Sequence, residues 1–278
     1  MKTLVAGSTG MFGGVILVLL LGAAVGFAFW RSSRGSKVLT DPLSEPLNGA
    51  TTAKVDINAG AGNLAIDRLT GGEPLLVSGA LQYPESQGVP MRTLNSSSSQ
   101  AAFSLKSEDA GKPWIRFPWD ACNLAFDWQI HLNPAVSADI TAHSGGGNVR
   151  LDLAGMLVTN VSADTGGGNI AVVLPDNTAD LNVTAKTGAG NVTVEIGSGL
   201  TGSSTVIAKS GAGNVVIHLP NGIAARLHVN SGMGKIKLDP RFIMIDKNTY
   251  QSSDYENAAN KVEITAGSGA GDVSVSPK

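Results

Sequence analysis

The chain has little cysteine, few aromatic residues and few charges, and each shortage excludes a class of protein. Only one of its 278 residues is a cysteine, Cys122, so an internal disulfide or a thiolate metal cluster is impossible. Aromatic residues make up 5% of the chain and charged residues 15%. The formal net charge of −2 lacks the basic excess of a nucleic-acid-binding surface. We therefore expect no nucleic-acid partner.

Motifs of catalysis and of cofactor binding are also missing. The glycine-rich segments match neither the phosphate-binding loop nor the dinucleotide-binding turn, and the four histidines lack the spacing of metal ligands. Calcium-binding β-rolls use aspartate where this chain mostly has asparagine. Asp120 and Asp127 lie near tryptophans and could act as a glycosidase pair by residue type, but no pattern fixes their separation. The sequence predicts no catalytic residue, no metal site and no cofactor.

Glycine, in contrast, is abundant, with 35 residues, and many of them belong to a pattern that recurs along the chain. A short turn pattern, Gly-x-Gly followed by a polar residue, occurs seven times. Its copies are 60–63, 145–148, 166–169, 188–191, 211–214, 232–235 and 269–272. From the second copy to the sixth they recur every 21 to 23 residues. A period in this range is typical of a solenoid, in which each repeat forms one rung of a stack.

Each glycine turn is followed by alternating apolar and mixed residues. Val149 and Leu151 flank Arg150, for example, in the segment after the second copy. An alternation of period two is typical of a strand with one buried face, and the two glycines permit a sharp corner before it. The sequence therefore predicts an all-β fold, a β-solenoid with stacked rungs of about 22 residues.

Stacking assigns a structural role to the asparagines of the turns. Asn148, Asn169, Asn191 and Asn214 occupy the same position in successive copies. In a stack they would lie one above another, where their amides can bond along the stack or cap the turn locally. We expect these four residues to form a structural ladder.

Residues 11–30 are apolar and uncharged, which is long enough for one membrane-spanning helix. A cleaved signal peptide is the alternative interpretation, although the segment is long for one and lacks a clear cleavage site. The flanking charges favour a cytoplasmic solenoid weakly, whereas the low lysine content and the Ser/Thr/Asn-rich surface favour export. We expect a single-pass protein of the cell membrane with the solenoid outside the cytoplasm, and the opposite orientation stays open.

The remaining chain divides by composition. We predict an N-terminal tail over residues 1–10, the transmembrane helix over 11–30, a juxtamembrane linker over 31–50, an N-terminal β region with an aromatic cap over 51–135, and the repeat solenoid over 136–278. The aromatic segment holds Trp114, Trp119 and Trp128. Its rings could cap the open end of the stack or form an exposed patch that binds sugar, lipid or protein.

Several segments resemble one family. The runs 127–134, 145–153 and 166–175, together with 55–82 and 253–275, are similar to the toast-rack proteins. These include the N-terminal toast-rack domain, adhesin repeat domains and the LiaF-like C-terminal domain. The resemblance covers nearly everything after residue 50. It implies a membrane-anchored β-solenoid of bacterial or archaeal envelopes and brings no catalytic residues. LiaF-like proteins have several membrane helices where this chain has one.

These observations lead to two functional hypotheses. The first is a membrane-anchored, non-enzymatic β-solenoid that serves as a sensing or scaffolding module of the cell envelope. It would contact membrane lipid through its one helix, and its partner would be another envelope protein or a second copy of the chain. The alternative is a surface adhesin or glycan-binding module, which requires the solenoid to lie outside the cell.

Overall fold

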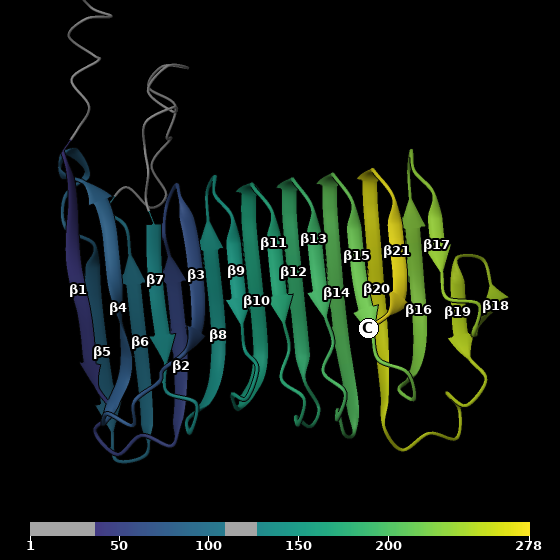
Figure 1. Ribbon diagram of the computed structural model, residues 1–278, viewed down its shortest axis with the longest axis horizontal. Coiled ribbons are helices and arrows are strands. Elements are labelled where there is room, and N and C mark those ends of the chain that lie inside the picture. Colours follow the sequence, from purple (N-terminus) through teal and green to yellow (C-terminus); the bar gives the residue numbers. More distant parts are fainter. Residues whose placement is uncertain (1–36, 109–126) are drawn as a thin grey trace, which may run out of the picture. The chain divides into compact units, whose positions relative to one another are not determined.

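The computed structural model describes residues 37–108 and 127–278 (Figure 1). Residues 38–278 belong to one compact unit. The predicted transmembrane helix over residues 11–30 and two of the three highlighted tryptophans, Trp114 and Trp119, lie outside the described residues. Within the described part of the chain, no helix has the length and apolar character needed to cross a membrane.

The described chain consists almost wholly of strands in two sheets, which confirms the all-β prediction. The ten-stranded sheet has the spatial order β1 (Val38–Pro46), β4 (Leu75–Pro84), β7 (Asp127–Leu132), β3 (Asn63–Arg68), β9 (Val149–Asp152), β11 (Ile170–Val173), β13 (Val192–Glu195), β15 (Val215–Leu219), β21 (Val273–Pro277) and β17 (Ile236–Leu238). Apart from strands, one short 3₁₀ helix, Glu85–Gln87, is found in the described residues.

The second sheet has eleven strands. Its spatial order is β18 (Phe242–Asp246), β19 (Thr249–Ser252), β16 (Ala224–Ser231), β20 (Lys261–Ala270), β14 (Ser203–Ala212), β12 (Asn182–Ala189), β10 (Val158–Gly167), β8 (Ser137–Ser144), β2 (Thr52–Asn58), β6 (Gln100–Lys106) and β5 (Met91–Ser97). Figure 1 shows these strands succeeding one another along the molecule, from β1 and β5 to β17 and β18.

Each central repeat supplies one strand to each sheet. β12 runs in the eleven-stranded sheet, the chain turns at Gly188–Gly190, and β13 continues in the ten-stranded sheet. Neighbouring repeats pair in parallel and in register, so that Val192 lies opposite Ile170 on one side and Val215 on the other. The inward residues of both sheets form one continuous hydrophobic core. The molecule is therefore a two-sheet β-solenoid whose rungs are the sequence repeats.

The corners between the sheets require glycine because successive backbones stack too closely for a side chain. A Cβ at Gly190 would lie under 3.0 Å from the carbonyl oxygen of Gly168 in the next rung. The φ of Gly190 is also +145°, a conformation that other residues adopt rarely. The middle position of the turn is different, because a Cβ at Gly146 or Gly167 would meet no atom within 4 Å. This difference explains why alanine or methionine stands there in other copies.

The seventh copy of the turn does not form the end of the stack. Its strands, β20 and β21, lie between the rung β14–β15 and the rung β16–β17, which precede it in sequence. The segment between β17 and β20 makes this possible because it forms an antiparallel hairpin, β18–β19, that pairs with β16 at the far end of the sheet. The chain then returns past β16 to add its last rung.

The predicted linker over residues 31–50 is wrong for its second half. β1 occupies residues 38–46 and pairs with β4 in an antiparallel register, with Val38 opposite Pro84. Leu43 of this strand is buried in the core. Pro42 and Pro46 argue against a strand when the sequence is read alone. Proline is nevertheless tolerated in an edge strand, where its missing N–H faces solvent. The predicted boundary at residue 135 is not a break either, because β2 pairs directly with β8.

The corner geometry predicts a strong position effect among the glycines of one turn. We expect Gly190→Val to lower the free energy of unfolding by about 1–3 kcal/mol through backbone strain, with the clash against Gly168 in addition. Gly167→Ala is the matched control, since it adds a Cβ at an open position of a neighbouring corner. Chemical denaturation of both variants measures the difference. Equal stability of the two proteins would contradict the corner assignment.

Candidate functional site

Trp128, one of the three tryptophans of the predicted binding patch, lies in the core. It sits on β7, where inward residues alternate with outward ones, and its side chain is 0% exposed. Within residues 37–108 and 127–278, its indole Nε1 has no hydrogen-bond partner. The assignment of Trp128 to an exposed patch is therefore wrong, because the strand alternation turns its ring inward. The structure does not describe Trp114 or Trp119.

The four asparagines of the predicted ladder lie in one file along the corner. The side-chain Oδ1 of Asn148 accepts a hydrogen bond from the backbone N–H of Asn169 at 2.9 Å. Asn169 accepts from the N–H of Asn191, and Asn191 from that of Asn214, at the same distance. The bonds thus run from backbone to side chain between rungs, where the sequence suggested amide-to-amide bonds or local capping.

The file extends beyond these four residues at both ends. Asn63 Oδ1 accepts the N–H of Asn148 at 3.2 Å. At the other end Asn214 Oδ1 accepts the N–H of Asp272, and Asp272 Oδ1 accepts that of Lys235, both at 2.9 Å. Hydrogen bonds from the Lys237 ammonium and the Lys235 N–H hold the pKa of the Asp272 carboxyl below its usual value. Aspartate continues the ladder because it keeps the accepting oxygen.

A second file of hydrogen bonds lies behind the first. The buried hydroxyls of Thr165, Thr187 and Ser210 donate to carbonyl oxygens of Gly147, Gly168 and Gly190 in the neighbouring rungs, at 2.7–2.8 Å. Ser144 and Ser268 make the same contact in their rungs. The side-chain oxygens of the asparagines and the buried hydroxyls thus bond between rungs. The corner edge therefore serves to hold the stack together.

The eleven-stranded sheet carries two open grooves on its outward face. The first, here called the Lys54 groove, lies near the N-terminal end of the stack and is lined by Thr52, Lys54, Asn95, Gln100, Asp139 and neighbouring residues. Lys54 and Asp139 stand opposite each other on the adjacent strands β2 and β8. The positive and negative charges of this groove therefore balance.

The second groove, here called the Gly267 groove, lies near the other end of the sheet. Its polar lining residues are Lys209, Ser210, His228, Asn230, Lys247, Asn248, Thr249, Thr265 and Ser268. Gly267 stands in register between Lys209 of β14 and Asn230 of β16, and its missing side chain leaves the hollow between them. No aspartate or glutamate is among the lining residues. The groove therefore has an excess of positive charge.

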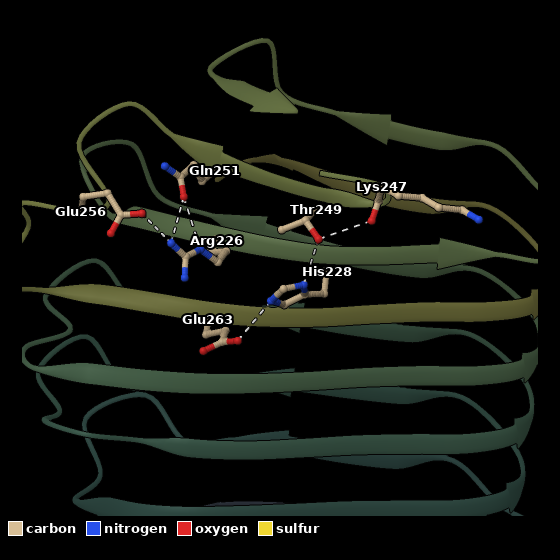
Figure 2. Close-up of polar contacts among 7 residues, drawn as sticks. All are labelled: Arg226, His228, Lys247, Thr249, Gln251, Glu256 and Glu263. Carbon is tan, nitrogen blue, oxygen red and sulfur yellow. Dashed lines mark hydrogen bonds and ion pairs between the residues drawn. The ribbon is translucent and has the colours of Figure 1, made fainter. Parts of the chain in front are cut away.

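The β18–β19 hairpin, which brings Lys247 and Thr249 to this groove, is attached to β16 by a set of polar contacts (Figure 2). The Arg226 guanidinium donates to Gln251 at 3.1 Å and pairs with Glu256 at 2.6 Å. His228 lies 3.3 Å from Thr249 through Nδ1 and 3.1 Å from Glu263 through Nε2. His228 thus joins the hairpin to β20, and both of its ring nitrogens are engaged.

Tyr255 packs its ring against the Arg226 guanidinium and so adds to this attachment. The Arg226 guanidinium lies 4.4 Å from the centre of the Tyr255 ring, and the Lys261 ammonium lies 5.3 Å from it. Both are cation–π contacts. Burial raises the pKa of the Tyr255 hydroxyl, with Arg226 opposing the rise. The phenol therefore stays neutral at physiological pH and serves as an apolar support for the hairpin.

Two further histidine–carboxylate pairs join neighbouring rungs. His131 pairs with Asp67 on the ten-stranded sheet, and His143 lies 3.0 Å from Asp164 on the eleven-stranded sheet. In residues 37–108 and 127–278, no cluster of three or more histidine, cysteine, aspartate or glutamate side chains could hold a metal ion. We attribute the outward histidines to contacts within the stack.

The fold places the protein among the parallel β-solenoids with glycine corners, and comparison with known proteins specifies the family. Residues 33–195 match the family model "N-terminal domain of toast_rack, DUF2154". The match spans more than half of the chain, so the chain belongs to the toast-rack family. The comparison with curated proteins found no match.

One solved structure shares this architecture. A protein from Clostridium sporogenes ATCC 15579 described as "a putative cell adhesion protein" is 20% identical, with a TM-score of 0.62, over 87% of this chain and 100% of its own. At this identity the likeness concerns the fold. A structure from Bacteroides fragilis described as "a putative adhesin" is 8% identical over 86% of this chain and 97% of its own, with a TM-score of 0.29. This score is too low to show a shared fold.

The asparagine file predicts that the accepting oxygen matters more than the amide. We expect Asn169→Ala to lower the free energy of unfolding by about 0.5–1.5 kcal/mol, because the Asn191 N–H loses its partner. Asn169→Asp keeps Oδ1, as Asp272 does naturally, and should retain most of the stability. Thermal and chemical denaturation measure both. A loss in Asn169→Asp as large as in Asn169→Ala would show that the amide group carries the contact.

Proposed function

We propose that this protein is a non-catalytic binding module displayed on the cell surface, with residues 11–30 as its membrane anchor. The observation that carries the proposal is the outward face of the eleven-stranded sheet. Its strands pair in register, and its side chains form two open grooves. Such a surface suits an extended ligand laid across the strands.

Rigidity supports this function. Ladder bonds between strands, the asparagine file and the hydroxyl file all connect one rung to the next. Side chains on neighbouring rungs therefore keep fixed spacings of about 4.8 Å without relying on loops. A ligand that contacts several rungs would meet preorganised groups, which reduces the entropy lost on binding.

Relatives support display at the surface. The chain belongs to the toast-rack family. The similar structure from Clostridium sporogenes is described as "a putative cell adhesion protein". The apolar segment 11–30 has the length of a membrane span. Together these features favour a solenoid held at the outer side of the membrane.

Display can be tested with a lysine-reactive biotin reagent that does not cross membranes, applied to intact host cells. Lys186 lies exposed on the outward face, outside both grooves, so we expect it to be labelled as fully in intact as in lysed cells. A cytoplasmic protein serves as the unlabelled control, and mass spectrometry of peptides gives the labelled fraction. Labelling of the solenoid only after lysis would refute surface display.

A second candidate function is scaffolding through self-association, and the two ends of the stack favour it. At the C-terminal end, the edge strand β18 exposes Ile243, Met244 and Ile245 by 61%, 60% and 50%. At the N-terminal end, β1 contains Pro42 and Pro46, which cannot donate hydrogen bonds to an added strand. Arg92 of β5 also donates to the Pro42 carbonyl, 3.2 Å away.

A head-to-tail contact would pair β18 with β5, the other edge strand of its own sheet, and would continue into an open filament. Contact between two C-terminal ends is closed and symmetric, which limits assembly to a pair. The second candidate is therefore a dimer joined edge to edge at β18, which would cluster two anchored solenoids.

Light scattering of the full chain in neutral detergent tests the dimer. We expect the mass of a dimer for the unchanged protein and of a monomer for the double variant Ile243→Lys, Ile245→Lys. Val38→Lys places a lysine on an exposed residue of the opposite end, one charge where the double variant adds two, and should leave the dimer intact. A dimer that persists in the double variant would arise elsewhere, for example from residues 11–30, and a monomeric unchanged protein would also refute this candidate.

A further inference from the structure

We propose that the Gly267 groove binds an acidic saccharide, a sugar chain that carries carboxylate or sulfate groups. This inference rests on the proposed function and specifies its ligand. The Gly267 groove is preferred to the Lys54 groove because of charge. Lys54 faces Asp139 across adjacent strands, whereas the Gly267 groove is lined by Lys209 and Lys247 and by no carboxylate.

The two lysines line the groove from different elements. Lys209 projects from β14 on one side of Gly267, and Lys247 belongs to the turn between β18 and β19. Among the described residues, neither ammonium makes an ion pair; the lysine pairs present are Lys106–Asp56 and Lys237–Asp272. Two cations on opposite sides of a hollow suit an anion that lies between them or a ligand with repeated anionic groups.

Neutral groups of the lining indicate the rest of the ligand. Asn230 and Asn248 offer amides, and Thr249 and Thr265 offer hydroxyls, all on the groove. Amides and hydroxyls both donate and accept hydrogen bonds, as sugar hydroxyls do. The strands that bear Lys209, Gly267 and Asn230 span two strand spacings, roughly 10 Å, which is comparable to the length of a disaccharide. The donor set therefore fits an acidic sugar better than a bare inorganic anion.

The hollow itself depends on Gly267. This glycine is the one member of its column without a side chain, between Lys209 and Asn230 in register. A Cβ there would meet only the Asn230 carbonyl oxygen at 3.7 Å, an ordinary contact. Unlike the corner glycines, Gly267 is thus not required by the backbone. A concave floor of this kind admits a projecting ring but not a planar bilayer, so we favour a saccharide over a lipid surface.

The hairpin contacts of Figure 2 position one side of the groove. Arg226 is hydrogen-bonded to Gln251 and forms an ion pair with Glu256. His228 is hydrogen-bonded to Thr249, which lies two residues from Lys247. The Lys247 backbone N–H is bonded in turn to Asp246 Oδ1 at 2.6 Å. Glu263 lies beside the groove, but its carboxylate is engaged with His228 Nε2. These contacts assign Arg226 and His228 to positioning and leave the lysines for the ligand.

Binding is tested with the full chain in neutral detergent against immobilised polygalacturonate, heparin and uncharged dextran. We expect binding to at least one acidic polymer, weakened by salt, and none to dextran. Lys209→Gln and Lys247→Gln should each weaken binding about tenfold, since each removes a charged hydrogen bond. Gly267→Thr fills the hollow without backbone strain and should weaken binding while the melting temperature is unchanged.

Lys54→Gln is the matched control, because it makes the same charge change in the other groove of the same face. An equal loss in Lys54→Gln and Lys209→Gln would overturn the site, as would the absence of binding to both acidic polymers. Binding to phosphatidylglycerol vesicles alone would replace the saccharide by a lipid surface and overturn the proposal too. Biotin labelling of intact cells tests display separately, so failure of the groove and failure of the surface function are distinguishable.

Discussion

The structure depends on the close parallel stacking of glycine corners. At each corner, the carbonyl oxygen of one rung occupies the space that a side chain of the next would need, as between Gly168 and Gly190. This approach brings the asparagine oxygen within reach of the neighbouring N–H and the buried hydroxyl within reach of the neighbouring carbonyl. Two files of hydrogen bonds and the in-register ladders of both sheets follow from one steric condition.

Because every rung offers nearly the same edge to its neighbours, the stack accepts a rung from a distant part of the chain. β20 and β21 pair with β14 and β15 on one side and with β16 and β17 on the other. Asp272 fits into the asparagine file between Asn214 and Lys235. The last rung is consequently held from both sides, while the excursion before it forms the β18–β19 hairpin at the end of the sheet.

This arrangement also creates the Gly267 groove. Insertion of β20 places Gly267 between Lys209 and Asn230, and the hairpin brings Lys247 and Thr249 to the same region. The contacts of Arg226 with Gln251, Glu256 and Tyr255 hold the hairpin against β16. The positive groove thus lies where Gly267 lacks a side chain, between Lys209 on β14 and Lys247 on the β18–β19 hairpin.

The rung can be predicted from the sequence because its requirements are local. Glycine at two turn positions and alternation of apolar residues over the following strand, as in Val149 to Leu151, specify a corner and a half-buried strand within one repeat. The resemblance to toast-rack proteins rested on the same repeats. The folded chain was needed to show which rungs are neighbours, that β1 pairs with β4 despite its prolines, that Trp128 faces the core, and that Gly267 opens a groove. These features depend on pairing between strands far apart in the chain. The strands have similar alternating sequences, so the sequence alone does not specify which strands pair.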